Sequence, residues 1–431
     1  MSTYPSRSNH LYPNHIQTTS PCRANPSPCY PKRSSTGSLT VSRSFHYVHL
    51  FRELKLEDEF ETSKKFKAKI AKKWKILDSN HSLAENVRIL DISIGEEHNT
   101  KIFSDATFLK ILNLLKGSPF PPHALRLEQP GNSLQPEKML PALVKASLHQ
   151  TLTTIFLKTT IYDEDCSNVP LSIFPVCSKL KDITLQDVKI PKESEELSIP
   201  AGVDSSPPKI LRLDYRNSDQ LVKYFLEPPP SLGPLVDLSN LHILKACPHE
   251  KEDMACVQPI LDIASETLEE LYLTTLSTSD IPDERRQFPL AKLVNLKSLS
   301  KLRTFEIYVI INAKAKQHVV LRDLISVLKT CPASNSIQRF MLHVSIYGSK
   351  PFKGCLDEDW DGVCEEVVRI SADKPMEFHL YSAVETNNLS TKTTGDAALY
   401  QKIEARVEVA LAEHEHISFH PLNTITRWVA E

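Results

Sequence analysis

Glycine is scarce in this chain, which has 10 glycines among 431 residues, and no two of them lie within five positions of each other. Loops that hold phosphate groups need closely spaced glycines so that backbone N–H groups can approach the ligand. The scarcity therefore excludes the GxGxxG and GxxxxGK[ST] patterns of nucleotide-binding proteins. The GxSxG and HExxH segments of hydrolases and metalloproteases are missing as well. We expect neither a cofactor nor a catalytic residue, and hence no enzyme.

An excess of one charge, paired cysteines and long apolar runs are also missing. Lysine and arginine number 51 against 53 acids, a net charge of −2 that gives no general case for nucleic acid or a membrane surface as partner. The nine cysteines form no CxxC pair. With no apolar signal segment at the start, we expect reduced thiols in the cytoplasm, the nucleus or both. The longest apolar run, Ile307–Ile311, is too short to span a bilayer.

Acidic residues are absent from the first 52 residues, which contain six prolines, ten serines and six lysines or arginines. Such a stretch buries too little apolar surface to offset the entropy of ordering it, so we expect residues 1–43 to form a disordered basic tail. A mitochondrial transit peptide is the alternative for an acid-poor start, but the prolines oppose the amphipathic helix that such a peptide needs.

Leucine, in contrast, is abundant, with 53 residues. An apolar-x-x-apolar-x-apolar pattern recurs along the chain at intervals of 28 to 38 residues. The middle positions of its copies are Leu90, Leu125, Ile155, Ile183, Leu211, Leu241, Leu271, Phe305, Phe340 and Phe378. The even spacing indicates a structural repeat, because a random distribution of apolar residues would not maintain it.

Helical segments with one apolar face lie in most of the intervals, as in Asp105–Lys116, Lys138–Leu148, Asp253–Ala264 and Val319–Thr330. A unit of helix, turn and short strand cannot enclose its own apolar face, so it must stack on its neighbours. The sequence therefore predicts an α/β fold, an irregular leucine-rich-repeat-like solenoid with a curved parallel sheet inside and helices outside. We expect this solenoid over residues 81–390, preceded by a strand and a Lys-rich capping helix (44–80) and followed by a capping helix and strand (391–431).

A family resemblance rests on the segment SRSFHYVHLFRELKL at 42–56 and on the passage SLAENVRILDIS at 82–93. Together they resemble the junction between F-box and repeats in fungal F-box/leucine-rich-repeat proteins, and the resemblance extends over residues 42–385. It implies a substrate-recognition subunit of an SCF-type cullin ubiquitin ligase, joined to the ligase by a Skp-type adaptor. Residues 1–40 lack the Leu-Pro-x-Glu helix start of an F-box. We therefore expect a missing or truncated box, with a remnant in 44–80, and adaptor binding only if the box is restored.

The inner face of the predicted sheet is the candidate binding surface, because solenoids bind other proteins on concave arrays of side chains. Arginine, tyrosine, methionine and histidine are well represented there, and several of these residue types are enriched at protein interfaces. We expect a protein target of unknown identity to contact Arg126, Phe156, Lys158, Arg212, Asp214, His242, Tyr272, Glu306, Tyr308, Met341, His343, His379 and Tyr381.

Two other functions stay open. The first is a stand-alone leucine-rich-repeat scaffold with no link to ubiquitination. The second, weaker one is a nuclear, nucleic-acid-associated factor that uses the seven lysines between Lys64 and Lys75. These lysines flank an apolar stripe at helical spacing, which is more typical of a solvated helix face.

Three further clusters of residues are explained more simply by structural roles than by metal binding or catalysis. The acids Asp357–Asp361 match half of a calcium loop, but the bidentate glutamate that should follow is Val368, and acids also open helices. His414, His416 and His420 lie on an alternating tail with no further ligand beside them, which indicates a strand edge. Cys177, Cys247 and Cys331 recur beside predicted strands, as small packing residues do. We expect no metal site.

Overall fold

The computed structural model of the chain describes residues 52–58, 63–94, 102–130, 136–160, 171–188, 203, 205–228, 233–248, 254–274, 290–312, 320–347, 355–385 and 394–423. Their strands form one sheet in which every strand pairs in parallel with the next strand of the chain. These strands are β1 (Glu53–Asp58), β2 (Ile89–Ile94), β3 (Ala124–Pro130), β4 (Thr154–Thr160), β5 (Asp182–Gln186), β6 (Arg212–Arg216), β7 (Ile243–Cys247), β8 (Glu270–Thr274), β9 (Thr304–Asn312), β10 (Arg339–Tyr347), β11 (Met376–Glu385) and β12 (Ile417–Asn423).

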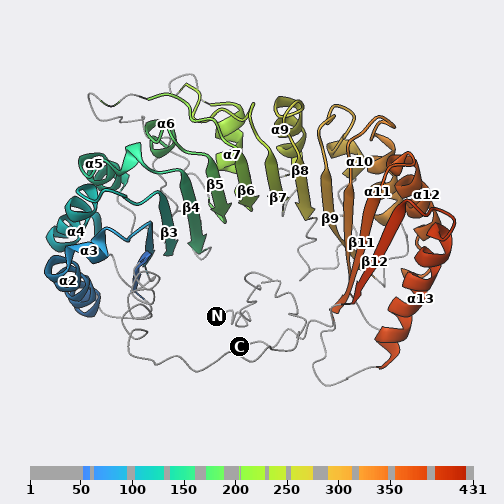
Figure 1. Cartoon of the computed structure of the whole chain (residues 1–431), viewed down its shortest axis with the longest axis horizontal. Coiled ribbons are helices and arrows are strands. Elements are labelled where there is room, and N and C mark those ends of the chain that lie inside the picture. Colours follow the sequence, from blue (N-terminus) through green and yellow to red (C-terminus); the bar gives the residue numbers. More distant parts are fainter. Residues whose placement is uncertain are drawn as a thin grey trace, which may run out of the picture.

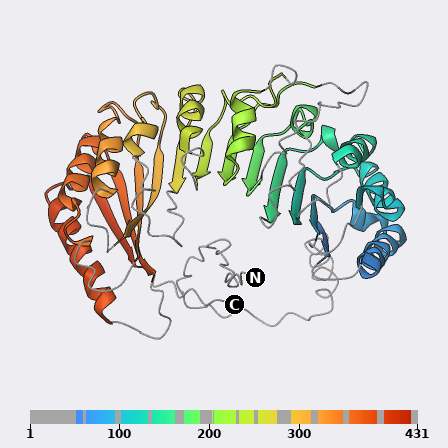
Figure 2. The same ribbon diagram turned by 180° about the vertical axis from the view of Figure 1, so that it is seen from behind.

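The helices lie along the outer side of the arc that the sheet describes, and the inner side is lined by strands (Figures 1 and 2). The α-helices of the described residues are α2 (Ser63–Ser79), α3 (His81–Ala84), α4 (Ala106–Lys116), α5 (Pro136–Lys145), α6 (Ile173–Val176), α7 (Asp219–Leu226), α9 (Val257–Ile263), α10 (Leu290–Leu293), α11 (Val320–Lys329), α12 (Trp360–Ser371) and α13 (Thr394–Leu411). Two 3₁₀ turns, Ile102–Ser104 and Leu148–Gln150, complete the set.

The predicted α/β solenoid, with a curved parallel sheet inside and helices outside, is confirmed. The sheet is open, with β1 at one end of the strand order and β12 at the other. It extends beyond the predicted 81–390 at both ends, because β1 and β12 continue the same ladder. The predicted tail 1–43 lies outside the described residues.

One apolar residue from each strand stands beside its counterpart in the next strand and points away from the concave side into the core. We call this row the core ladder; it consists of Leu54, Leu90, Leu125, Ile155, Ile183, Leu213, Leu244, Leu271, Phe305, Phe340, Phe378 and Phe419. The members from Leu54 to Phe378 are at most 2% exposed. Because strand residues alternate between faces, this ladder fixes which side chains reach the concave face.

The register of β6 and β7 corrects two predicted ladder positions. Leu213, two residues after the predicted Leu211, stands opposite Ile183, and Leu244, three residues after the predicted Leu241, stands opposite Leu213. The physical reason is that the pattern occurs twice in each segment. The copies that the fold uses are Ile210/Leu213/Tyr215 and Leu241/Leu244/Ala246, all of them buried. They end on tyrosine and alanine, which a search for Leu, Ile, Val, Phe and Met does not detect.

Two turns that need a positive φ use aspartate and asparagine in place of glycine. Asp187 follows β5 with φ 58°, and Asn217 follows β6 with φ 45°. The two side chains bond to each other, Asn217 Nδ2 donating to Asp187 Oδ1 at 3.1 Å. Asparagine and aspartate tolerate this conformation better than other residues with a side chain, which reconciles repeated turns with few glycines.

Aromatic rings strengthen the core ladder at its C-terminal end. The ring of Phe340 stacks on Phe305 at 5.6 Å between centroids and on Phe378 at 5.4 Å, and Phe378 contacts Phe419 at 5.6 Å. The strands are also longer here, with nine residues in β9 and in β10 and ten in β11. Stacked phenyl rings bury a large apolar area, so each long strand is held firmly against the next.

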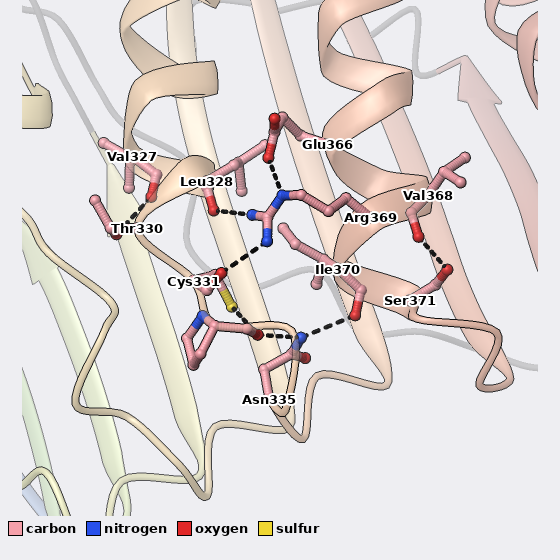
Figure 3. A network of polar contacts seen from close by, with 11 residues as sticks. Val327, Leu328, Thr330, Cys331, Asn335, Glu366, Val368, Arg369, Ile370 and Ser371 are labelled. Atoms are coloured by element: carbon pink, nitrogen blue, oxygen red, sulfur yellow. Dashed lines mark hydrogen bonds and ion pairs between the residues drawn. The ribbon is translucent and has the colours of Figure 1, made fainter.

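Hydrogen bonds join α11 to α12 at the outer side of these strands (Figure 3). Arg369 of α12 donates to the carbonyls of Leu328 at 2.7 Å and Cys331 at 2.9 Å, and its Nε donates to Glu366 at 2.6 Å. Asn335 Nδ2 donates to the carbonyl of Ile370 at 2.8 Å. The last carbonyls of a helix have no partner within it, so Arg369 both satisfies the end of α11 and ties two units together.

Phe340→Ala should lower the free energy of unfolding by about 3–5 kcal/mol, because it removes a buried ring and leaves a cavity between Phe305 and Phe378. Urea denaturation followed by circular dichroism measures the change. Phe120→Ala is the matched control, since this ring is 62% exposed and its loss should cost less than about 1 kcal/mol. Equal losses in the two variants would contradict the ladder.

Candidate functional site

The concave face is formed by the strand residues that alternate with the core ladder. Of the predicted contact residues, those on β3, β4, β6, β8, β9, β10 and β11 all occupy such positions; they are Arg126, Phe156, Lys158, Arg212, Asp214, Tyr272, Glu306, Tyr308, Met341, His343, His379 and Tyr381. The structure thus brings these residues to one face, in chain order.

His242 lies elsewhere, at the residue before β7, and this corrects its predicted position in the row. Its Nδ1 is 3.1 Å from Glu269 Oε1, a neighbour at the corresponding edge of β8. The place expected for His242 belongs to Lys245, which pairs in register with Asp214 and Tyr272. The shift follows from the register of β7, where Leu244 and not Leu241 joins the core ladder.

Charged residues dominate the half of the concave face that β1–β6 form, and they pair with one another. We call this half the N-terminal concave surface; it comprises Glu53, Lys55, Asp91, Arg126, Glu128, Phe156, Lys158, Arg212 and Asp214. Lys158 bonds to Glu128 across β3 and β4. Arg126 Nη1 lies 3.6 Å from Glu53, and Arg212 Nη2 lies 3.6 Å from Asp214. Most of the charge on this half is therefore neutralised within the chain.

Asp91 on the N-terminal concave surface has a perturbed carboxyl group. Its side chain is 13% exposed and its Oδ2 lies 3.9 Å from Arg126 Nη1. Burial, a hydrogen bond with Glu53 and the charge of Glu53 raise the pKa of Asp91 to about 6, against the opposing effect of Arg126. Two carboxyl groups so close together resist being ionised at the same time.

Aromatic and imidazole rings dominate the other half. We call it the C-terminal concave surface; it comprises Tyr272, Glu306, Tyr308, Met341, His343, His379, Tyr381 and His420. The rings of His343 and Tyr381 stack at 4.1 Å between centroids with an interplanar angle of 2°. His379 and His420 stack at 4.7 Å, and Tyr308 lies 6.3 Å from His343. Neighbouring strands thus place their rings in a continuous strip across β9–β12.

Two histidine nitrogens in this strip are buried, and no hydrogen-bond partner for them exists among the described residues. They are Nδ1 of His379 and Nε2 of His343. The latter lies 3.1 Å from Glu306 Oε1, within ion-pair distance but without hydrogen-bond alignment. Burial holds the pKa of His379 below its ordinary value, and the charge of His420 acts in the same direction while Glu377 opposes it. A buried nitrogen without a hydrogen bond costs free energy in the folded chain.

Polar pairs border the rings on the side where the strands begin. Arg339 Nε donates to Glu377 Oε2 at 2.7 Å, a bond that holds the pKa of this carboxyl below its usual range. Tyr272 donates to Glu270 at 2.6 Å, and the ammonium group of Lys245 lies 4.4 Å from the centroid of the Tyr272 ring. An apolar strip with a polar border is the usual anatomy of a protein-binding surface.

The sequence did not identify four residues of this region: Lys245, Arg339, Glu377 and His420. Lys245 was missed because the predicted register of β7 was wrong. His420 follows Phe419, which continues the core ladder from Phe378, so extending the repeat by one more interval would have found it. Arg339 and Glu377 come just before their ladder residues, at a position that the prediction did not consider.

The acids and histidines weighed as metal ligands have structural partners. Asp359 caps α12 by accepting from the backbone N–H of Gly362 at 3.1 Å, and Asp361 accepts from Arg406 at 2.6 Å. His416 Nε2 lies 2.8 Å from the hydroxyl of Ser371, whereas His420 stacks on the concave face. Within the described residues, no three histidines, cysteines or acids gather as metal ligands would.

The cysteines that recur beside strands are packing residues where the structure buries them. Cys177 and Cys331 are at most 3% exposed. Burial raises the pKa of the Cys177 thiol to about 12 and that of Cys331 to about 11. Thiols that stay protonated at neutral pH are poor nucleophiles. Cys247 is half-buried at the end of β7.

Among the helices that the structure describes, none combines the length and the apolar character needed to cross a membrane. Comparisons of the chain with family models, with curated proteins and with solved structures found no match. The fold and the face together define the class: an open α/β solenoid of parallel strands, with charge pairs on one half of its concave face and stacked rings on the other.

Asp91→Asn should stabilise the protein at neutral pH. The unfolded chain releases the Asp91 proton near pH 4, whereas the folded chain keeps it up to about pH 6, so folding stability falls as the pH rises between these values and is constant above them. Asparagine does not titrate. The variant should have a higher free energy of unfolding than the wild type at pH 7. This difference between the two proteins should be about 1–3 kcal/mol larger at pH 7 than at pH 4. Urea denaturation at both pH values tests this, and a pH-independent difference would contradict the raised pKa.

Proposed function

We propose that the protein is a non-enzymatic interaction module that binds another protein on its C-terminal concave surface. The observation that carries the proposal is the ring strip itself, in which His343 stacks on Tyr381 and His379 on His420. Tyrosine and methionine are enriched where proteins meet, and rigid rings lose little conformational entropy on binding.

The contrast between the two halves of the concave face supports this choice of surface. On the N-terminal half, Lys158 and Glu128 already pair, and Arg126 approaches Glu53. A partner would have to break or desolvate these pairs. On the C-terminal half, a partner would cover rings that already stack on one another, and rigid rings lose little conformational entropy on binding.

For the cellular role we propose substrate recognition for an SCF-type cullin ubiquitin ligase, in the cytoplasm or the nucleus. The support is the resemblance of residues 42–93 to the junction of F-box and repeats, which implies a first strand directly after the box. The parallel pairing of β1, Glu53–Asp58, with β2 supports this proposal, because it adds a strand at the place where the resemblance puts one. A leucine-rich-repeat scaffold without any ubiquitin link is the second candidate, favoured by the lack of a Leu-Pro-x-Glu start in residues 1–40.

Removing the strip should abolish partner recovery. The test variant carries Tyr308→Ala, His343→Ala and Tyr381→Ala, and we expect at least about a thirtyfold loss of a partner recovered with the tagged wild type, as for interface residues at the centre of a contact. Quantitative mass spectrometry of affinity-purified protein measures it. The control variant, Arg322→Ala with Lys329→Ala on the outer side of α11, should retain the partner.

The same purification separates the two roles. Recovery of a Skp-type adaptor with both the wild type and the strip variant would support the ligase subunit, because the family resemblance would put an adaptor site before the solenoid. Recovery of a partner protein without the adaptor would support the scaffold role instead. Equal recovery of every protein by the strip variant and the wild type would contradict binding on the C-terminal concave surface.

A further inference from the structure

Helix α2 stands at the N-terminal end of the arc, on its outer side (Figures 1 and 2). Its apolar stripe is fixed in the core, where Phe66, Ile70 and Leu77 are at most 1% exposed. This packing directs the remaining circumference of the helix outward. The seven lysines of α2 lie on that part; they are Lys64, Lys65, Lys67, Lys69, Lys72, Lys73 and Lys75.

Helix α2 itself carries a strongly positive charge, with seven lysines and one acid, Asp78. Lys69 donates to the backbone carbonyl of Glu57 at 3.3 Å. For the lysines at 64, 65, 67, 72, 73 and 75, no ion pair with any carboxylate occurs within the residues that the structure describes. The arrangement therefore differs from the concave face, where lysines and arginines approach acids.

The adjacent helix enlarges this patch. Helix α4, which packs against α2, contributes Lys110 and contains no acid. Lys110 Nζ lies 6.0 Å from the centroid of the Trp74 ring, at the contact between the two helices. We call the seven lysines of α2 together with Lys110 the lysine patch.

The far end of the arc has the opposite balance. Helices α12 and α13 hold six acids against three basic residues; the acids are Asp361, Glu365, Glu366, Asp396, Glu404 and Glu408, and the basic residues are Arg369, Lys402 and Arg406. The helices at the two ends of the arc thus differ in the sign of their charge, although the net charge of the chain is only −2. A positive electrostatic potential at one end of the arc attracts a polyanion even when the net charge of the whole chain is close to zero.

We propose that the lysine patch binds the phosphate backbone of double-stranded nucleic acid. A helix of 17 residues is about 25 Å long, which matches about seven successive phosphates of one strand at 3.4 Å of duplex axis each. Lys67 and Lys73 border the buried stripe on its two sides, and Lys72 lies between them on the outermost part of the helix. Lysines on both flanks can reach both walls of a groove, which is about 12 Å wide in B-DNA.

The same geometry argues against a membrane as the occupant. Helices that lie on bilayers insert an apolar face between lipid head groups. In α2 that face is occupied by the core, and among the described residues of the helix no large apolar side chain is strongly exposed. Contacts would be made to phosphates alone, so binding should depend on charge density, which is highest in a duplex.

Fluorescence anisotropy with the full chain and a labelled DNA duplex of about 20 base pairs, or an RNA duplex of the same length, tests the proposal. We expect micromolar binding at low salt. Contacts to about five phosphates would make the logarithm of the binding constant fall with the logarithm of salt concentration at a slope of about −4.5. Comparison of the two duplexes shows whether one form of nucleic acid is preferred.

The decisive variant reverses four exposed lysines of α2: Lys64→Glu, Lys65→Glu, Lys72→Glu and Lys75→Glu. We expect at least a tenfold loss of affinity and a shallower salt slope. The matched control makes the same change in net charge away from the patch, with Lys179→Glu, Lys297→Glu, Lys301→Glu and Lys329→Glu, and should bind within twofold of the wild type. Circular dichroism checks folding, and a variant with glutamine at the four α2 positions replaces the first if that variant unfolds.

Three results would overturn the proposal. One is the absence of binding to either duplex at low salt. Another is an equal loss of affinity in the patch variant and the control variant, which would indicate an effect of net charge alone. The third is patch-dependent sedimentation with vesicles containing phosphatidylserine in the absence of duplex binding, which would assign the lysines to a membrane surface.

Discussion

The core ladder is the constraint on which the rest of the structure depends. A single helix–strand unit exposes an apolar face that it cannot cover, and the ladder covers it by placing one buried side chain beside the next from Leu54 to Phe378. Because the strands are parallel and each follows the last in sequence, the helices must return on one side of the sheet. That side becomes the convex face, and the other side is left open to solvent.

Function follows from this division of faces. Side chains that alternate with the ladder reach the concave face in chain order, so a change of composition along the sequence becomes a change of chemistry along the arc. The pairs around Arg126 and Lys158 neutralise the charge of one half. The rings of His343, Tyr381 and His379 form the other half and retain buried nitrogens without hydrogen bonds in the described chain. The helices on the convex side, in contrast, expose the side chains of their outer positions, as the lysines of α2 show.

The period of the apolar pattern predicted the fold class and the face of nearly every candidate residue, because alternation in a strand is local. It could not predict register in β6 and β7, where two overlapping copies of the pattern compete and Tyr215 and Ala246 complete the one that is used. The choice between them depends on neighbouring strands and so is not local. Ring stacking between His379 and His420 was also beyond the sequence, since 41 residues separate two side chains that only the sheet brings together.

Hydrogen–deuterium exchange across the full chain tests most directly the claim that one continuous ladder joins both halves of the face. Amides in ladder strands should exchange slowly because they open only with the surrounding core. If the ladder is continuous, 210–216 and 241–247, where the register departs from the simplest interpretation of the sequence, should be protected as strongly as 183–186 and 270–274. Rapid exchange confined to residues 205–248 would contradict it, since the two halves would then be separate bodies without a shared concave surface.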